Sequence, residues 1–463
     1  MTFASLVFLY GFLPVVMGIY YILPHRCRNG FLLLANIVFY GWGEPRFLIV
    51  IAFACVFNYF FGRAIEHHRA DKAKAKQIFV MAVMVDVALL AVFKYTNFVT
   101  GILHNIIPAL PVSRIPLPLG ISFYTFHVLS YLIDVYRGDV QSQKSLVRFG
   151  TYMSLFPQMV AGPIVRYKEI QDQLGIRHEN LERFASGIKL FAIGLGKKVL
   201  IANQMGRLWD TLQQPGAQLG MVGAWGGALA FTFQIYFDFS GYSDMARGLG
   251  RMLGFELPIN FNYPYIARSA TEFWRRWHIT LSQWFRDYVY IPMGGSRRGL
   301  PHTIVNLFVV WLLTGMWHGA NWNFILWGLF YFVFLALEKL FLKKWLDRAP
   351  AFVAHLYTIL IFVLGWVLFG IEDLSSLGHY FGLLFGAGGF AAGADIASTL
   401  LSYLPLLAFA TFGSVPVLRN LWRKVAGGRM AWLPETIGCV AVLVLCTASL
   451  VSQGYNPDLY AHF

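Results

Sequence analysis

The sequence predicts an all-α polytopic membrane protein, and three of its features agree on this class. Of its 463 residues, 57% are hydrophobic and only 13% are charged, whereas soluble domains usually carry about 25% charged residues. Several apolar runs reach about 20 residues, which is long enough for a helix to cross a hydrocarbon core of roughly 30 Å. Lysine and arginine gather in short loops between these runs, as the positive-inside rule predicts. This pattern explains the net charge of +14 better than nucleic-acid binding does.

The N-terminal part is expected to begin with a retained span and a helical hairpin. The apolar run Phe3–Leu23 is followed by a basic stretch at 25–28 and not by a small-residue cleavage site, so we do not interpret it as a signal peptide. A second basic stretch lies at 63–76. If both basic stretches are cytoplasmic, the chain between them must return to the same side, with a Gly/Pro turn at 41–45. The first span then starts outside.

The centre of the chain is less regular. Proline and glycine interrupt apolar sequence at 115–120 and again at 156–163. Broken helices at membrane depth are tolerated only where protein or a water-filled cavity surrounds them, so we expect a non-lipid interior within 115–320. We expect one membrane domain over 1–463, with N-terminal spans at 1–110, a core at 111–345 and scaffold helices at 346–463.

Neither a disulfide framework nor a metal site is expected. Cys439 and Cys446 lie seven residues apart in one helical run, which separates them by roughly 10 Å, too far for a disulfide. His278 and His318 are 40 residues apart with no cysteine or glutamate beside either. We therefore predict no bound metal and no bound cofactor.

His318 is the sharpest candidate for catalysis. It ends an apolar run that starts at Trp311, and Gly315 and Gly319 leave room beside it for another backbone or a ligand. Ionisable groups inside spans cost several kcal/mol unless paired, so each is a functional candidate. A near-neutral imidazole is the natural base for a hydroxyl nucleophile. The alternative is a structural histidine that bonds a carbonyl group across helices.

Residues 271–291 predict one amphipathic helix, because large apolar residues recur at steps of three and four. His278 falls at the edge of this apolar stripe. One interpretation is an anchor in the membrane interface without chemistry. The other places basic side chains near a phosphate-bearing donor, because a guanidinium group binds phosphate bidentately. The basic residues concerned are Arg275, Arg276 and Arg286.

Asp238 and Asp244 lie in a polar interruption of another apolar run. They are expected to face the interior, where they would orient a histidine or stabilise its charged form. The alternative is a salt bridge to Arg247 or Arg251. From the residues alone, an acyltransferase and a transporter or flippase without chemistry both stay open, because broken helices and buried histidines also mark transport pathways. Cleavage of a thioester would separate the two.

Seven stretches resemble the membrane-bound O-acyltransferases, most closely the bacterial branch typified by alginate O-acetylation proteins. The stretches are 39–47, 117–126, 156–158, 161–167, 236–246, 272–278 and 313–320. The resemblance implies roughly 10–13 transmembrane or re-entrant helices in a ring around a central tunnel. It matches His318 to the catalytic histidine of the family and His278 to a second functional histidine. Further residues are expected to bind the donor or the substrate, namely Arg275, Arg276, Arg286, Asp238, Ser240, Asp244, Trp317 and Asn321.

The resemblance also implies a reaction, partners and a location. The donor would be cytoplasmic acetyl-CoA as a co-substrate, and the acetyl group would pass outward for O-acetylation of alginate, cellulose or peptidoglycan. An extracytoplasmic SGNH-hydrolase-like transferase would be the partner, and the bacterial inner membrane the location. Teichoic acid D-alanyl transferases share the two histidine motifs, so a D-alanyl transferase-like member stays an alternative. One departure from the family pattern is His127, which stands where glutamine is expected and adds a third intramembrane histidine.

Overall fold

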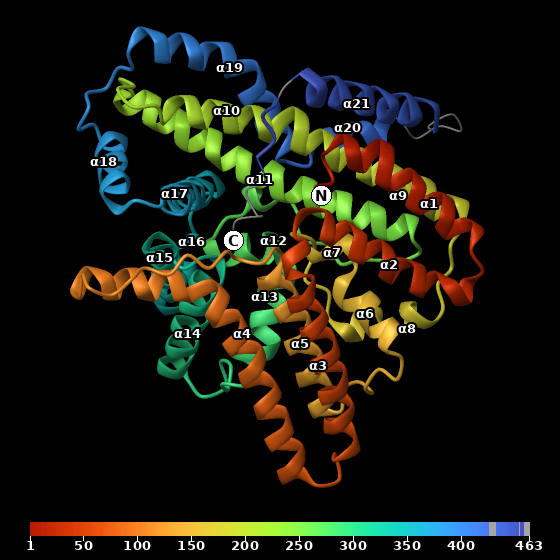
Figure 1. Ribbon diagram of the computed structural model, residues 1–463. Helices are drawn as coiled ribbons and strands as arrows, with labels where there is room; N and C mark the ends of the chain where they lie inside the picture. Colours follow the sequence, from red (N-terminus) through yellow and green to blue (C-terminus); the bar gives the residue numbers. More distant parts are fainter. Residues whose placement is uncertain (426–431, 453, 458–463) are drawn as a thin grey trace. The chain divides into compact units, whose positions relative to one another are not determined.

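The computed structural model describes residues 1–425, 432–452 and 454–457, and over these ranges the chain is helical without any strand (Figure 1). This confirms the predicted all-α class. The first part of the chain forms these elements, in which η marks short 3-10 or π segments: η1 (Phe8–Phe12), α1 (Leu13–Ile22), α2 (His25–Gly43), η2 (Pro45–Phe47), α3 (Leu48–His67), α4 (Lys72–Ile106), α5 (Ile121–Arg137), α6 (Leu146–Ser154), α7 (Phe156–Met159), α8 (Tyr167–Gly175), α9 (Leu181–Gly196), η3 (Lys197–Ala202) and α10 (Asn203–Leu212).

The second part of the chain is also a succession of helices. Its elements are α11 (Gly220–Met252), η4 (Pro264–Ile266), α12 (Ala270–Arg276), α13 (Ile279–Phe285), η5 (Arg286–Tyr290), α14 (Leu300–His318), α15 (Trp322–Leu337), η6 (Glu338–Leu342), α16 (Lys343–Leu346), α17 (Ala351–Gly370), α18 (Leu374–Leu384), α19 (Ala394–Gly413), α20 (Val417–Val425) and α21 (Trp432–Ser452).

Seven helices in the described ranges are long and apolar enough to cross a membrane, which confirms a multi-pass membrane protein. They are Pro45–His67, Lys72–Ile106, Leu300–His318, Trp322–Leu346, Ala351–Gly370, Ala394–Gly413 and Trp432–Ser452. A shorter apolar helix covers Phe8–Ile22.

The chain forms two compact units. Unit 1 comprises Met1–Phe191 and Tyr242–Pro258, and unit 2 comprises Ala192–Gly241 together with the described residues from Ile259 onward. The long helix α11 therefore contributes to both. The predicted irregular segments are present in unit 1, since residues 107–120 are not helical and α7 is a single turn.

In unit 1, α2 and α3 are joined at residues 44–47, near the turn of the predicted helical hairpin. The two helices diverge from this turn, because α2 packs mainly against α6, and α3 packs mainly against α4 and α5. The predicted hairpin is therefore not formed beyond its turn. Figure 1 shows that α3 and α4 form a long hairpin instead. His127 on α5 is fully buried, and neither of its ring nitrogens has a hydrogen-bond partner among the described residues. The structure therefore does not support a hydrogen-bonding role for His127.

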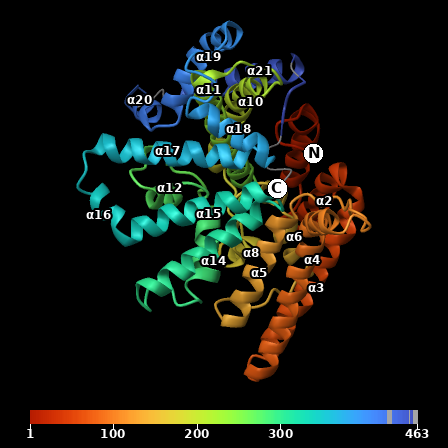
Figure 2. The same ribbon diagram turned by 90° about the vertical axis from the view of Figure 1, so that its left-hand side faces the viewer.

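In unit 2, α14, α15 and α17 lie side by side (Figure 2). Two glycines let α14 and α15 approach at backbone distance. A Cβ atom on Gly315 would lie 2.4 Å from the carbonyl oxygen of Phe324, and one on Gly328 would lie 2.4 Å from that of Trp311. Because a backbone oxygen cannot rotate away as a side chain can, these positions require glycine.

Gly328→Ala is therefore expected to destabilise the protein by about 1–3 kcal/mol, the usual cost of overpacking. The matched control is Gly378→Ala on α18, where the added Cβ meets nothing within 4 Å. At that exposed helical position alanine is favoured over glycine by up to about 1 kcal/mol. Thermal unfolding of both variants in detergent measures the difference. Equal melting temperatures for the two variants would contradict the close approach.

Candidate active site

The stretch 271–291, which the sequence predicted as one amphipathic helix, is broken at His278. The helix α12 ends at Arg276, α13 begins at Ile279, and the π segment η5 follows. His278 has φ 42° and ψ 54°, which is the left-handed region that residues other than glycine rarely adopt. The single-helix prediction is wrong, because the backbone N–H groups that follow His278 donate to a distant residue instead of to the preceding helical turn.

Asn260 is the residue that holds this break. Its backbone oxygen accepts a hydrogen bond from Ile279 N at 3.0 Å. Its Oδ1 accepts from Thr280 N at 3.3 Å and from Thr280 Oγ1 at 3.0 Å, and it lies 3.1 Å from His278 Nδ1. Because the backbone N–H of Thr280 can only donate, the contacted side-chain atom of Asn260 is oxygen. His278 Nδ1 must therefore carry the hydrogen, which leaves the lone pair on Nε2.

His278 is a neutral base in a dry environment. Its side chain is fully buried, with the ring of Phe239 edge-on at 4.7 Å between centroids. Burial lowers the pKa of His278 to about 3, so the ring is uncharged at neutral pH. Among the described residues, Nε2 has no hydrogen-bond partner. This nitrogen can accept a hydrogen bond or a proton from a substrate.

His318 is the last residue of α14 and is only 2% exposed. Its imidazole is surrounded edge-on by aromatic rings, with centroids 4.9 Å from Trp317, 4.9 Å from Trp327 and 5.2 Å from Phe369. Trp317 also lies 6.0 Å from His278. One tryptophan therefore contacts both imidazoles, and the fold brings the two predicted histidines into a single aromatic cluster in unit 2.

A groove of about 420 Å³ runs along α14 toward this cluster. Its α14 lining consists of Leu307, Val310, Trp311 and Thr314, which stand at i, i+3, i+4 and i+7 and therefore share one face of the helix. Thr314 lies four residues, or about 6 Å of helical rise, before His318. Neither imidazole lines the groove itself, so the groove ends one turn short of the histidine.

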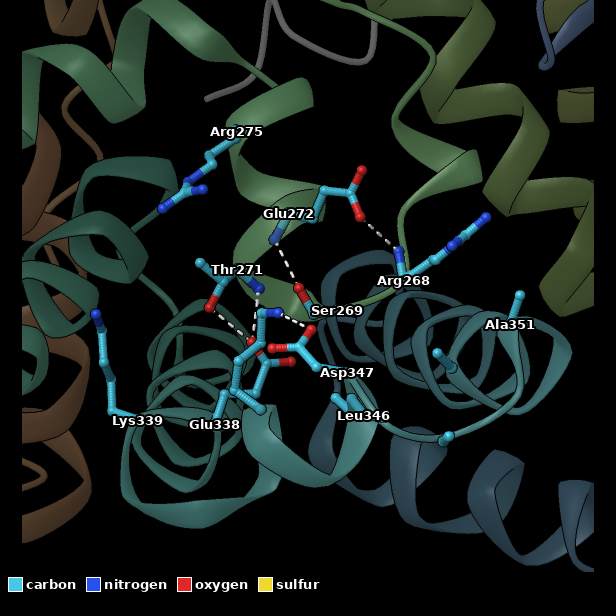
Figure 3. Close-up of a pocket in the computed structure, with 13 residues that line it drawn as sticks. Arg268, Ser269, Thr271, Glu272, Arg275, Glu338, Lys339, Leu346, Asp347 and Ala351 are labelled. Carbon is cyan, nitrogen blue, oxygen red and sulfur yellow. Dashed lines mark hydrogen bonds and ion pairs between the residues drawn. The ribbon is translucent and has the colours of Figure 1, made fainter.

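A second cavity of about 530 Å³ adjoins this groove (Figure 3). Thr271, Arg275 and Lys339 line both spaces. Figure 3 shows Arg275 and Lys339 on one side of the contact between Thr271 and Glu338, and Arg268 on the other. Neither the Arg275 nor the Lys339 side chain has a salt bridge or hydrogen bond to a described residue. The positively charged side chains of Arg275 and Lys339 therefore lie without an acidic partner among the described residues where the groove and the cavity meet.

Glu338 anchors the start of α12 from the neighbouring helix. Its carboxylate accepts hydrogen bonds from Ala270 N at 2.6 Å, Thr271 N at 2.9 Å and Thr271 Oγ1 at 2.6 Å. A fourth bond comes from the hydroxyl of Tyr357 on α17, at 3.1 Å. The residue is buried, with 3% of its surface exposed. Glu338 at one end and Asn260 at the other thus fix the helix that leads to His278.

The remaining basic candidates have acidic partners. Arg276 pairs with Glu272 at 2.9 Å, and Arg286 pairs with its neighbour Asp287 at 2.7 Å. Arg286 nevertheless lines the groove, whereas Arg276 lines neither space. Of the predicted arginines, Arg275 is therefore the one best placed to bind an anion.

The two aspartates on α11 are both in ion pairs. Asp238 is buried and bonds to Lys198, a partner that the sequence analysis did not consider. Asp244 lies 3.7 Å from Arg247, which agrees with the salt-bridge alternative.

The other two polar candidates lie in different settings. Ser240 is buried, and its hydroxyl has no hydrogen-bond partner among the described residues. Asn321 caps α15, since its Oδ1 accepts from Trp322 N at 2.6 Å. Asn321 thus has a structural task at the end of the turn that follows His318.

Sequence reasoning missed three residues of this site: Asn260, Glu338 and Lys339. Glu338 and Lys339 were visible as charges directly after an apolar run, which is where charges are ordinary. Asn260 sits in a loop with no pattern around it. The role of each of these three residues in the site can be recognised only from its contacts in the folded structure.

Comparison with known proteins places this site in a family context. The profile of MBOAT, the membrane-bound O-acyltransferase family, matches residues 47–371, a range that includes both histidines, the groove and the second cavity. The chain is 39% identical over 506 residues, with 100% of both chains covered, to a protein of Azotobacter vinelandii named "Probable alginate O-acetylase AlgI".

Two further relatives extend this comparison. A protein of the same name from Pseudomonas aeruginosa is 42% identical over 426 residues, covering 88% of this chain and 81% of the relative. A protein of Helicobacter pylori named "Peptidoglycan O-acetyltransferase" is 34% identical over 412 residues, covering 81% of this chain and 78% of the relative.

Proposed function

Because the chain belongs to the membrane-bound O-acyltransferase family, we propose that it passes acetyl groups from cytoplasmic acetyl-CoA across the membrane for O-acetylation of a polysaccharide. The single observation that carries this proposal is the groove that follows α14 from a cationic end to within one turn of His318. Relatives named for alginate align over the whole chain, so alginate is the acceptor to test first. Peptidoglycan and cellulose are the next.

The charge pattern supports arrival of the donor from the cytoplasm. Arg297 and Arg298 lie just before α14, and Lys343 and Lys344 lie in α16, the last turn of the span Trp322–Leu346. Under the positive-inside rule, both ends of this hairpin face the cytoplasm. His318, at the turn of the hairpin, then lies toward the far side. A thioester entering at the basic end would travel along α14 toward the imidazole.

The lining of the groove suits an acyl-CoA. Arg275, Arg286 and Lys339 stand where phosphate groups of the donor would bind, and arginine binds phosphate bidentately. Farther along, Leu307, Val310 and Trp311 offer an apolar wall for the arm that carries the thioester. Acetyl-CoA would be a co-substrate and not a resident cofactor.

In the proposed reaction, His318 acts as the general base that takes the proton from the attacking hydroxyl group. Two roles are open to His278, namely positioning the donor thioester or stabilising developing negative charge. The tautomer set by Asn260 leaves a lone pair and no hydrogen on Nε2, and the ring is neutral because burial lowers its pKa to about 3. Both features support the positioning role, because stabilising an anion needs a donor hydrogen.

The two unpaired cations give a sharp test of the donor site. The double variant Arg275→Ala, Lys339→Ala is expected to raise the KM for acetyl-CoA by roughly tenfold, about 1.4 kcal/mol of lost binding, with kcat unchanged. The reason is that both cations would contact the donor equally in the ground state and the transition state. Release of free CoA thiol from proteoliposomes measures both constants.

The matched control for this double variant is Lys344→Ala, which removes a charge from the same basic segment but lines neither space. It should leave the KM unaltered. A double variant with the KM of the unaltered protein would exclude this donor site. Intact acetyl-CoA in the presence of the acceptor would instead favour the transporter alternative.

The resemblance to the alginate branch supports the rest of the proposal. The location would be the bacterial inner membrane, and an extracytoplasmic SGNH-hydrolase-like transferase would receive the acetyl group and place it on the polymer. Mass spectrometry of polymer from a strain lacking this protein tests the pathway. Loss of polymer acetylation is the expected result, and unchanged acetylation would count against it. A teichoic acid product carrying D-alanine would point to the D-alanyl transferase alternative.

A further inference from the structure

Four aromatic side chains in unit 2 carry a buried hydrogen-bond donor that has no acceptor among the described residues. The donors are Nε1 of Trp274, Trp327 and Trp366 and the hydroxyl of Tyr331. Their side chains are almost wholly buried, with Trp327 and Tyr331 at 0% exposure. An indole nitrogen can only donate, and buried indoles usually find a partner. A buried donor without an acceptor destabilises the fold, so four in one place call for an explanation.

The four rings that carry these donors form one cluster around Trp327. The Trp327 ring centroid lies 5.6 Å from Trp274, 5.3 Å from Tyr331 and 6.3 Å from Trp366. These side chains come from α12, α15 and α17, so the tertiary fold assembles them. Trp274 also lines the groove that leads along α14. The cluster therefore lies where the groove ends.

Trp327 connects this cluster to the catalytic histidine. Its ring centroid lies 4.9 Å from that of His318, with the two rings at 79°. Of the four donor-bearing rings, Trp327 is the one with a ring contact to His318 in the described structure. The site thus combines an imidazole with a neighbouring indole ring whose N–H group has no acceptor among the described residues.

A cluster of donors without acceptors selects a ligand that supplies acceptor oxygen. In the proposed reaction the acyl carbonyl oxygen is such an acceptor, and it gains negative charge when the hydroxyl group attacks. Donors held in a dry site stabilise developing charge strongly, because they need no reorganisation at the moment of reaction. We propose that the indole N–H of Trp327 donates to the acyl carbonyl oxygen and stabilises the tetrahedral oxyanion. This inference rests on the proposed function.

The step balances without any further reactant. The acceptor hydroxyl oxygen bonds to the carbonyl carbon, the carbonyl electron pair moves to oxygen, and His318 takes the hydroxyl proton. Trp327 donates its hydrogen bond to the resulting oxyanion. When the C=O bond re-forms, the C–S bond breaks and the thiolate leaves with the proton from His318. Trp327 contacts a reacting atom in this scheme and is therefore a catalytic residue.

The decisive experiment removes the N–H group but keeps the ring. Replacing Trp327 with 3-benzothienylalanine by nonsense suppression puts sulfur in place of N–H with little change of shape. The expected result is a fall in kcat of about 10²–10³-fold, as for loss of one oxyanion donor. The KM for acetyl-CoA should change less than twofold, because the interaction strengthens in the transition state. Trp327→Phe is a second variant with the same expected direction.

The matched control is the same replacement at Trp225, whose Nε1 donates to the backbone oxygen of Leu384 at 3.0 Å. There the change should lower the melting temperature slightly and leave kcat intact. The Trp327 assignment alone is overturned if the 3-benzothienylalanine variant has a kcat within threefold of that of the unaltered protein while His318→Ala is inactive. If His318→Ala is active as well, the proposed function fails too. A lower melting temperature of the Trp327 variant without a change of kcat shows a purely structural indole and also overturns the assignment.

Discussion

His318→Ala is expected to reduce acyl transfer by about 10²–10⁴-fold, the usual contribution of a general base. The physical reason is that the acceptor hydroxyl group must lose its proton as it attacks the thioester. The ring of His318 is held by aromatic edges on three sides at 4.9–5.2 Å between centroids. No water-exposed base can substitute for it, since the residue is 2% exposed.

Initial rates of acetyl transfer in proteoliposomes measure this effect, together with the release of CoA thiol. The control is His379→Ala on α18, an exposed histidine outside the aromatic cluster, which should keep full activity. The melting temperature of the His318→Ala protein shows whether it is folded. Near-normal transfer by a folded His318→Ala protein would remove His318 from the mechanism.

Glu338→Ala is expected to have the largest effect on stability, with a loss of at least about 3 kcal/mol. Hydrogen bonds to a charged group are worth about 1.5–3 kcal/mol each, and the carboxylate of Glu338 accepts four. Removal leaves two backbone N–H groups and two hydroxyl groups without an acceptor in a buried place. The start of α12 should loosen, and His278 at its other end should lose its position.

Thermal unfolding in detergent compares Glu338→Ala with Glu272→Ala and Glu338→Gln. Glu272 also lies at the start of α12, but its side chain is 35% exposed, so its loss should cost about 1 kcal/mol, as for an ordinary cap. Glu338→Gln keeps one acceptor oxygen, so its melting temperature should lie between those of the other two variants. If the Glu338→Ala and Glu272→Ala proteins unfold at the same temperature, Glu338 does not anchor the helix.

These expectations depend on contacts of two kinds. The aromatic cage of His318 combines neighbours in the sequence, such as Trp317, with distant rings such as Phe369. The anchor of α12 joins Glu338 to Ala270, which lie 68 residues apart. A local pattern of residues can reveal contacts of the first kind in part. It holds no information on contacts of the second kind.

The broken helix at His278 shows how a local pattern can mislead. Steps of three and four between apolar residues favour one helix over 271–291, and α12, α13 and η5 do occupy most of that range. This local pattern contains no information on Asn260, which lies 18 residues before His278. Asn260 accepts the hydrogen bonds that a continuous helix would otherwise make there. That replacement makes a left-handed conformation tolerable at a residue other than glycine.

The sequence by itself determined the membrane class, the all-α architecture, the turn between α2 and α3 and the family, because hydrophobic length, turn residues and short motifs are local properties of the chain. It also marked His278 and His318 as candidates, since ionisable residues in apolar surroundings stand out in any sequence. The tertiary structure alone decided the tautomer of His278, the anchor at Glu338, the unpaired Lys339 and the cluster of donors around Trp327. Each of these depends on distances between residues far apart in the chain, which packing sets and local pattern does not encode.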